Sequence, residues 1–165
     1  MVVVGIDDRH FWGRPEWITQ AGLLLSSFAN MLGRELVSRE GSPLDQAERL
    51  FRAPFIVVSH GTEADPILNY ANAAALALWE MTPAQFMQTP SRLTAEPMHR
   101  DERARLLERT SREGFVDDYS GVRISKTGRR FMIEKAIVWN LEDESGQALG
   151  QAATFDRWTP LGRAP

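Results

Sequence analysis

The segment from Ser59 to Asp65 contains several side chains of the kinds that bind metal ions or act in acid–base catalysis. His60, Glu63 and Asp65 lie within six residues of one another, and Ser59 precedes the histidine. An imidazole beside two carboxylates can ligate a metal ion or act as an acid–base pair. The spacing matches no specific motif, and in a loop between strands such residues commonly hydrogen-bond backbone amides. We treat the three residues as a secondary candidate site and predict no catalytic residue and no metal site.

Composition narrows the classes of function. A chain of 165 residues is one domain of ordinary size, and its net charge of -3 gives no electrostatic case for nucleic acid or an anionic membrane. The absence of cysteine excludes disulfides, cysteine-ligated zinc and thiol catalysis. The apolar start is too short for a signal peptide, and no stretch approaches transmembrane length. We expect a soluble cytoplasmic protein.

Three consecutive strands joined by two tight turns organise the rest of the chain. The strands are expected at 116–125, 130–141 and 148–158, where β-branched and aromatic residues concentrate. The first turn, 126–129, contains Gly128, which is free to adopt positive φ, and the second is the polar run 142–146. Short connections force antiparallel neighbours, so we predict a meander.

Helices and two further strands precede the meander. We expect a long helix at 15–38, and a short one opened by the cap Ser42 and ended at Pro54. Strands at 55–59 and 67–70, helices at 73–81 (capped by Asn72), after Thr82 and at 97–114 then follow. This order predicts an α+β domain with an antiparallel sheet of about five strands.

The central strand of the meander is apolar on both faces. Alternation places Phe131, Ile133, Ile137 and Trp139 on one face, while Met132, Ala136 and Val138 lie on the other. The later helices cover one face, so the broad-striped helix 15–38 is expected to cover the other. The stripe can fold back on its own sheet or cross to a second copy. Its width favours a homodimer through residues 15–38.

The chain resembles a PAS domain, and within that class it is similar to the MEKHLA domain family. The stretches that carry the resemblance are APFIVVSHGTEADPILNYANAAALALWEM, PSRLTAEP, ERARLL and GFVDDYSGVRISKTGRRFMIEKAIVWNL, which with Trp158 span about Leu44–Trp158. The resemblance implies a PAS-like domain at 42–165, preceded by an arm and amphipathic helix at 1–41. No homeodomain or zipper accompanies it, so the DNA-binding role of the family's plant transcription factors does not carry over.

The resemblance also suggests which residues line a cavity. A charge buried there needs a partner or a ligand, whereas the aromatic residues suit a filled core equally well. Arg92 is our first candidate for contacting an anion, with an ion pair to Glu96, Asp117 or Asp118 as the alternative. The candidate ligand-binding residues are Trp79, Arg92, Tyr119, Arg123, Glu134, Trp139 and Phe155.

The identity of a cofactor stays open at this point. His99 lies roughly where haem-binding PAS domains place an axial histidine, although an exposed histidine in a first helical turn explains it as well. The missing cysteine excludes a flavin adduct but not flavin bound without a covalent bond.

Three classes of function follow. The first is a PAS-like sensory module that binds a small molecule without catalysis. The second is a pure dimerisation or partner-docking domain with a filled core. The third is a small enzyme with a cone-shaped, ketosteroid-isomerase-like fold that uses His/Asp acid–base chemistry. The presence of a cavity separates the first two classes, and the strand order tests the third.

Overall fold

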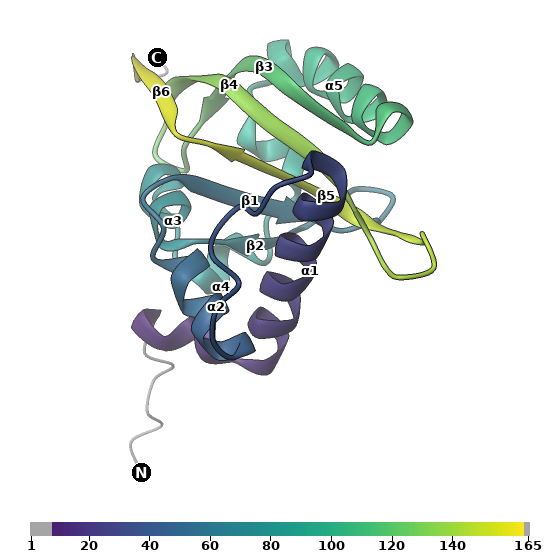
Figure 1. Cartoon of the computed structure of the whole chain (residues 1–165). Coiled ribbons are helices and arrows are strands. Elements are labelled where there is room, and N and C mark those ends of the chain that lie inside the picture. Colours follow the sequence, from purple (N-terminus) through teal and green to yellow (C-terminus); the bar gives the residue numbers. More distant parts are fainter. Residues whose placement is uncertain (1–7, 164–165) are drawn as a thin grey trace.

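A computed structural model describes residues 8–163 and shows an antiparallel sheet flanked by helices (Figure 1). Five strands lie in the order β2-β1-β5-β4-β3, and a sixth, β6, pairs with β4. The strands are β1 (Ile56–His60), β2 (Leu68–Ala71), β3 (Phe115–Ile124), β4 (Arg129–Glu142), β5 (Ala148–Phe155) and β6 (Arg157–Arg163). The predicted α+β class and the predicted meander are confirmed, and the open sheet is not the closed cone of the enzyme alternative.

The helices start at the predicted caps. Ser42 with Asp45, and Thr82 with Gln85, form reciprocal capping boxes at two of the helices. The helices are η1 (Asp8–Gly13), α1 (Pro15–Leu32), α2 (Pro43–Phe51), α3 (Ala73–Trp79), α4 (Pro83–Phe86), η2 (Ser91–Thr94), η3 (Pro97–His99) and α5 (Arg100–Glu113).

The first long helix is shorter than predicted. It ends at Leu32 rather than Ser38, because Gly33 adopts a left-handed conformation and its N–H closes the helix on the carbonyl of Ala29. Apolar residues beyond the glycine, such as Leu36, still pack on the core from an irregular segment.

Asn72 is fully buried, and its side chain forms hydrogen bonds with several elements of the fold. Its Oδ1 accepts hydrogen bonds from the backbone N–H groups of Ala75 in α3 (3.2 Å) and Val57 in β1 (3.1 Å). Its Nδ2 donates to the carbonyls of Phe55 (2.7 Å) and Leu50 (3.3 Å). The predicted cap of α3 therefore also joins that helix to α2 and β1.

The third predicted strand is two strands in the structure. β5 pairs with the C-terminal half of β4 and β6 with its N-terminal half, with a break at Asp156. Near the same level of the sheet, Lys135 in β4 has a positive φ of 50°. An irregularity of this kind bends a strand and changes which residues share a face.

The side chains of β4 therefore exchange faces at Lys135. Phe131 lies against Trp79 of α3, with ring centroids 5.2 Å apart, whereas Trp139 lies against Phe28 of α1 at 5.0 Å. The prediction that Phe131 and Trp139 share a face is wrong, because strict alternation does not hold across the bulge.

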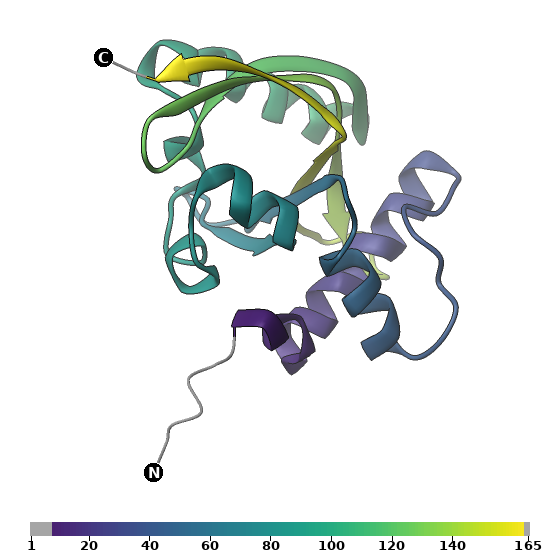
Figure 2. The same cartoon turned by 90° about the vertical axis from the view of Figure 1, so that its left-hand side faces the viewer.

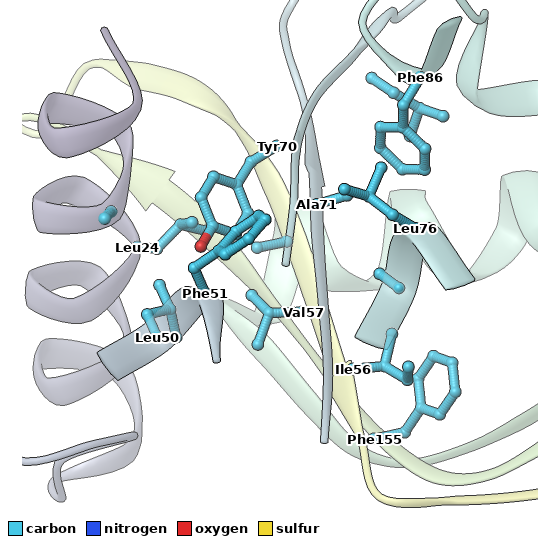
Figure 3. Packing of buried hydrophobic residues seen from close by; sticks show 14 of the residues in the cluster. Leu24, Leu50, Phe51, Ile56, Val57, Tyr70, Ala71, Leu76, Phe86 and Phe155 are labelled. Atoms are coloured by element: carbon cyan, nitrogen blue, oxygen red, sulfur yellow. The ribbon is translucent and has the colours of Figure 1, made fainter. Parts of the chain in front are cut away.

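Helices cover both faces of the sheet. Figure 2 shows α1 and α2 on one side and α3 and α4 on the other. Figure 3 shows the side chains of β1 and β2 dividing between them, with Val57 and Tyr70 toward α1, and Ile56 and Ala71 toward α3. Trp17 of α1 packs on Tyr70 with centroids 4.8 Å apart. The predicted cover by the N-terminal helix is confirmed, and the helix folds back on its own sheet.

Candidate ligand-binding cavity

An internal cavity of about 60 Å³ lies between the sheet and the α3–α5 side of the domain. Its lining comes from the strands β1, β2, β3, β4 and β5 and from the helices α3, α4, η2 and α5. The cavity is much smaller than the several hundred Å³ of a typical cofactor site. Flavin and haem do not fit it, and His99 is not among its lining residues.

About half of the predicted site residues meet in this cavity. Trp79, Tyr119, Arg123 and Phe155 line it, and His60 joins them from the secondary candidate loop. The irregularity at Lys135 changes which side chains of β4 face the cavity, so that both Ile133 and Val138 line it.

The other members of the loop do not accompany His60. Glu63 turns back to accept a hydrogen bond from the N–H of Ile67 at 3.1 Å. Asp65 pairs at the surface with Arg92, whose Nε lies 3.2 Å from the carboxylate. The His60, Glu63 and Asp65 side chains therefore form no joint site, and no metal-binding group of three His, Asp or Glu side chains occurs in the described part of the chain.

Three predicted ligand-binding residues lie away from the cavity. Arg92 pairs with Asp65 rather than with the predicted Glu96, Asp117 or Asp118. Trp139 is turned toward α1 by the bulge, and Glu134 accepts a hydrogen bond from Thr159 at 3.2 Å on an exposed part of the sheet.

Arg103 is a cavity residue that sequence reasoning missed. It projects from α5, is 9% exposed, and donates through Nη2 to Ser91 Oγ. The sequence places it on the same helical face as Leu106 and Thr110, both of which are buried. That position was the available signal, but an arginine in a charged helix is usually solvated.

Arg123 is the second buried arginine of the cavity. It is 7% exposed, its Nη1 donates to the carbonyl of Val122 at 2.9 Å, and its guanidinium lies 5.4 Å from the ring centroid of Tyr119. Burial and the charge of Arg123 lower the pKa of Arg103 to about 10, so Arg103 remains charged at neutral pH. Within residues 8–163, neither guanidinium forms an ion pair with a carboxylate.

Three other residues that line the cavity carry buried polar atoms without partners. His60 Nε2, Tyr119 OH and Trp79 Nε1 are buried and lack a hydrogen-bond partner among the described residues. Burial lowers the pKa of His60, so its imidazole is neutral at pH 7. Because Nδ1 lies 3.0 Å from the Gly61 carbonyl, we place the proton there, which leaves Nε2 as an acceptor.

Comparisons with known proteins agree with this architecture. The MEKHLA domain model matches residues 18–160. No curated protein matches the chain. Among solved structures, the PAS domain of a protein from Colwellia psychrerythraea is 14% identical, with a TM-score of 0.58 over 72% of this chain and 95% of that one.

Two light-responsive proteins are also similar in structure. An RNA-binding light-oxygen-voltage receptor is 15% identical, with a TM-score of 0.58 over 77% of this chain and 35% of that one. The light-state dimer of the fungal blue-light photoreceptor Vivid is 13% identical, with a TM-score of 0.53 over 79% of this chain and 91% of that one. At these identities the similarity shows a shared fold.

Proposed function

The chain belongs to the MEKHLA domain family, and from that premise we propose that it is a PAS-like sensory module that binds a small molecule without catalysis. The observation that carries the proposal is the cavity, which is lined by two buried arginines and by His60 and Tyr119, whose Nε2 and OH atoms have no partner among the described residues. Unpaired buried polar groups are costly to a fold. A ligand that completes their hydrogen bonds offsets that cost.

A route for a signal leads from the cavity to α1 through β1. His60 lines the cavity, and the adjacent Ser59 Oγ donates to Asn69 at 2.5 Å and accepts from Gln20 of α1 at 3.1 Å. A ligand that shifts His60 moves this hydrogen-bonded group. We infer that binding changes how α1 lies on the sheet.

The partner that receives the signal is proposed to be a second copy of the chain. The homodimer through residues 15–38 predicted from the sequence would use the side of α1 that faces away from the sheet, where Glu16, Thr19 and Asn30 are exposed. The dimeric Vivid structure supports this proposal by analogy of fold only. In the part of the chain that the structure describes, no helix has the length and apolar character needed to cross a membrane.

A screen by thermal unfolding tests the binding function. Compounds of up to about six heavy atoms are added to the full chain, and a ligand at 100 times its Kd should stabilise the fold by about 2.7 kcal/mol. Ala153→Leu, which adds a branched alkyl group at the cavity wall, should abolish the response while the protein stays folded by circular dichroism. A library with no stabilising compound would instead favour the docking domain with a filled core.

A further inference from the structure

We propose that the cavity binds the carboxylate of a short organic acid between Arg103 and Arg123, with the alkyl end of the acid against the apolar wall. The inference rests on the proposed function and specifies its ligand class. It combines three properties of the cavity, which are the charge of its two arginines, its small volume and its largely apolar lining.

The positive charge of the two buried arginines favours an anionic ligand. Arg103 and Arg123 are 9% and 7% exposed, and the protein acceptors found for their side chains are neutral, namely the Ser91 hydroxyl and the Val122 carbonyl. A guanidinium carries five N–H donors, so each arginine has donors to spare. Two buried cations that make no direct contact with a carboxylate are an unfavourable arrangement, although the charge of Asp65 favours the charged form of Arg103. A carboxylate can accept paired N–H bonds from guanidinium groups, which makes it the matching ligand chemistry.

The volume of the cavity limits the ligand to a small molecule. A cavity of about 60 Å³ has room for about four water-sized groups. Acetate and propionate, with four and five heavy atoms, suit this space. Nucleotides, flavins and long-chain acids exceed it.

The apolar side chains that line the cavity favour an organic carboxylate over an inorganic anion. Ser59, Thr94 and Gln151 also line the cavity, but their side chains already donate hydrogen bonds within the protein. Most of the remaining lining is apolar and includes Leu106 and Leu107 of α5, Ile133 and Val138 of β4, and Phe155 of β5. These side chains provide no hydrogen bonds for the far side of a nitrate or phosphate ion, and they favour an alkyl group there. Tyr119 OH, which lacks a partner, supplies a further donor for the carboxylate.

The neighbouring surface does not compete for the same ligand. Arg92 is paired with Asp65, and Arg130 lies 2.5 Å from Glu96 in a half-buried ion pair. These arginines already have carboxylate partners, so the anion preference belongs to the interior pair.

Calorimetry and amide NMR of the full chain test the proposal with acetate, propionate, propionamide and nitrate. Propionamide has nearly the shape of propionate without its charge, and nitrate has the charge without the alkyl end. We expect propionate to bind at least about 10-fold more tightly than propionamide, because charge-assisted hydrogen bonds are the stronger ones. It should also bind more tightly than nitrate, and the shifted amides should be those of α5, β3 and β1.

Matched variants identify the residues. Arg103→Met and Arg123→Met keep most of the side-chain volume and should each weaken propionate binding about 10- to 100-fold. Arg105→Met, an exposed position on the same helix, should leave the affinity unchanged. If a methionine variant fails to fold, Arg103→Lys and Arg123→Lys keep the charge and remove the paired geometry, and each should still weaken binding.

The possible outcomes separate this inference from the proposed function. Equal binding of propionamide and propionate would overturn the carboxylate inference and leave small-molecule binding intact. Nitrate binding as tight as propionate binding would overturn the role of the apolar wall. Failure of every compound, here and in the wider thermal screen, would overturn both proposals.

Discussion

Phe28 of α1 lies edge-on against Trp139 of β4, with ring centroids 5.0 Å apart and planes at 81°. Both side chains are fully buried. The contact joins the N-terminal helix to the central strand of the meander, on the face opposite the cavity. The amphipathic helix is therefore part of the same hydrophobic core as the sheet, although the domain boundary predicted at residue 41 stays a prediction.

Removing this contact should destabilise the domain strongly. Phe28→Ala leaves a large cavity in a packed core, and we expect the free energy of unfolding to fall by about 3–5 kcal/mol. Urea denaturation followed by tryptophan fluorescence measures the change. Arg105→Ala, at an exposed position of α5 outside the proposed dimer surface, is the control and should stay within about 0.5 kcal/mol of the wild type. A similar small loss for Phe28→Ala would contradict the packing of α1 on the sheet.

Gly150 allows β5 to approach β1 closely. Its φ is 138°, and a Cβ there would overlap the backbone carbonyl of His60. We expect Gly150→Ala to cost about 3 kcal/mol or more, since it combines an unfavourable backbone conformation with displacement of β1.

The matched control is Gly146→Ala, where φ is 85° but no atom lies within 4 Å of the added carbon. This change should cost about 1–2 kcal/mol from backbone strain alone. Urea denaturation compares the two variants. Equal losses would show that the close approach at His60 is not a constraint.

His60 should make the stability of the domain depend on pH. Burial lowers the pKa of His60 in the folded state, Arg103 lowers it further, and the hydrogen bond to Gly61 and the charge of Glu63 oppose these effects. In the unfolded chain the imidazole titrates at about 6.5. As the pH falls below that value, the unfolded state gains a proton that the folded state does not, so the free energy of unfolding decreases.

The measurement is the free energy of unfolding between pH 7.5 and the acid limit of reversible unfolding. His60→Gln should flatten the decrease below pH 6.5 relative to the wild type, whereas Gln88→Ala, which leaves all titratable groups in place, should keep the wild-type slope. An unchanged slope in His60→Gln would mean that the imidazole is protonated as readily in the fold as in the unfolded chain.

The proposed homodimer predicts that charges on the exposed side of α1 disrupt it. Thr19→Arg with Asn30→Arg changes two exposed positions and should convert a dimer to a monomer in sedimentation velocity. The melting temperature of the diluted protein should change little, because neither side chain is buried. A wild-type chain that sediments as a monomer at all accessible concentrations would refute the dimer.

Local signals in the sequence determined the elements of this protein. Asn72, Ser42 with Asp45, and Thr82 with Gln85 cap their helices through hydrogen bonds that span three residues, so the neighbouring sequence suffices to predict them. The meander follows from short turns between β-branched runs, and the family follows from stretches that persist in order along the chain. The α+β class, the antiparallel sheet and the cover by the N-terminal helix were therefore predictable.

Tertiary structure decided which side chains meet. The positive φ of Lys135 reverses the faces of β4, which moves Trp139 from the cavity to α1, and no local pattern marks that position. Arg103 enters the cavity because α5 packs that side of the helix on the sheet, while Arg92 stays outside with Asp65. Caps and turns depend on neighbours a few residues away. The burial of a charge depends instead on how distant elements pack, and that packing places Arg103 and Arg123 in one cavity.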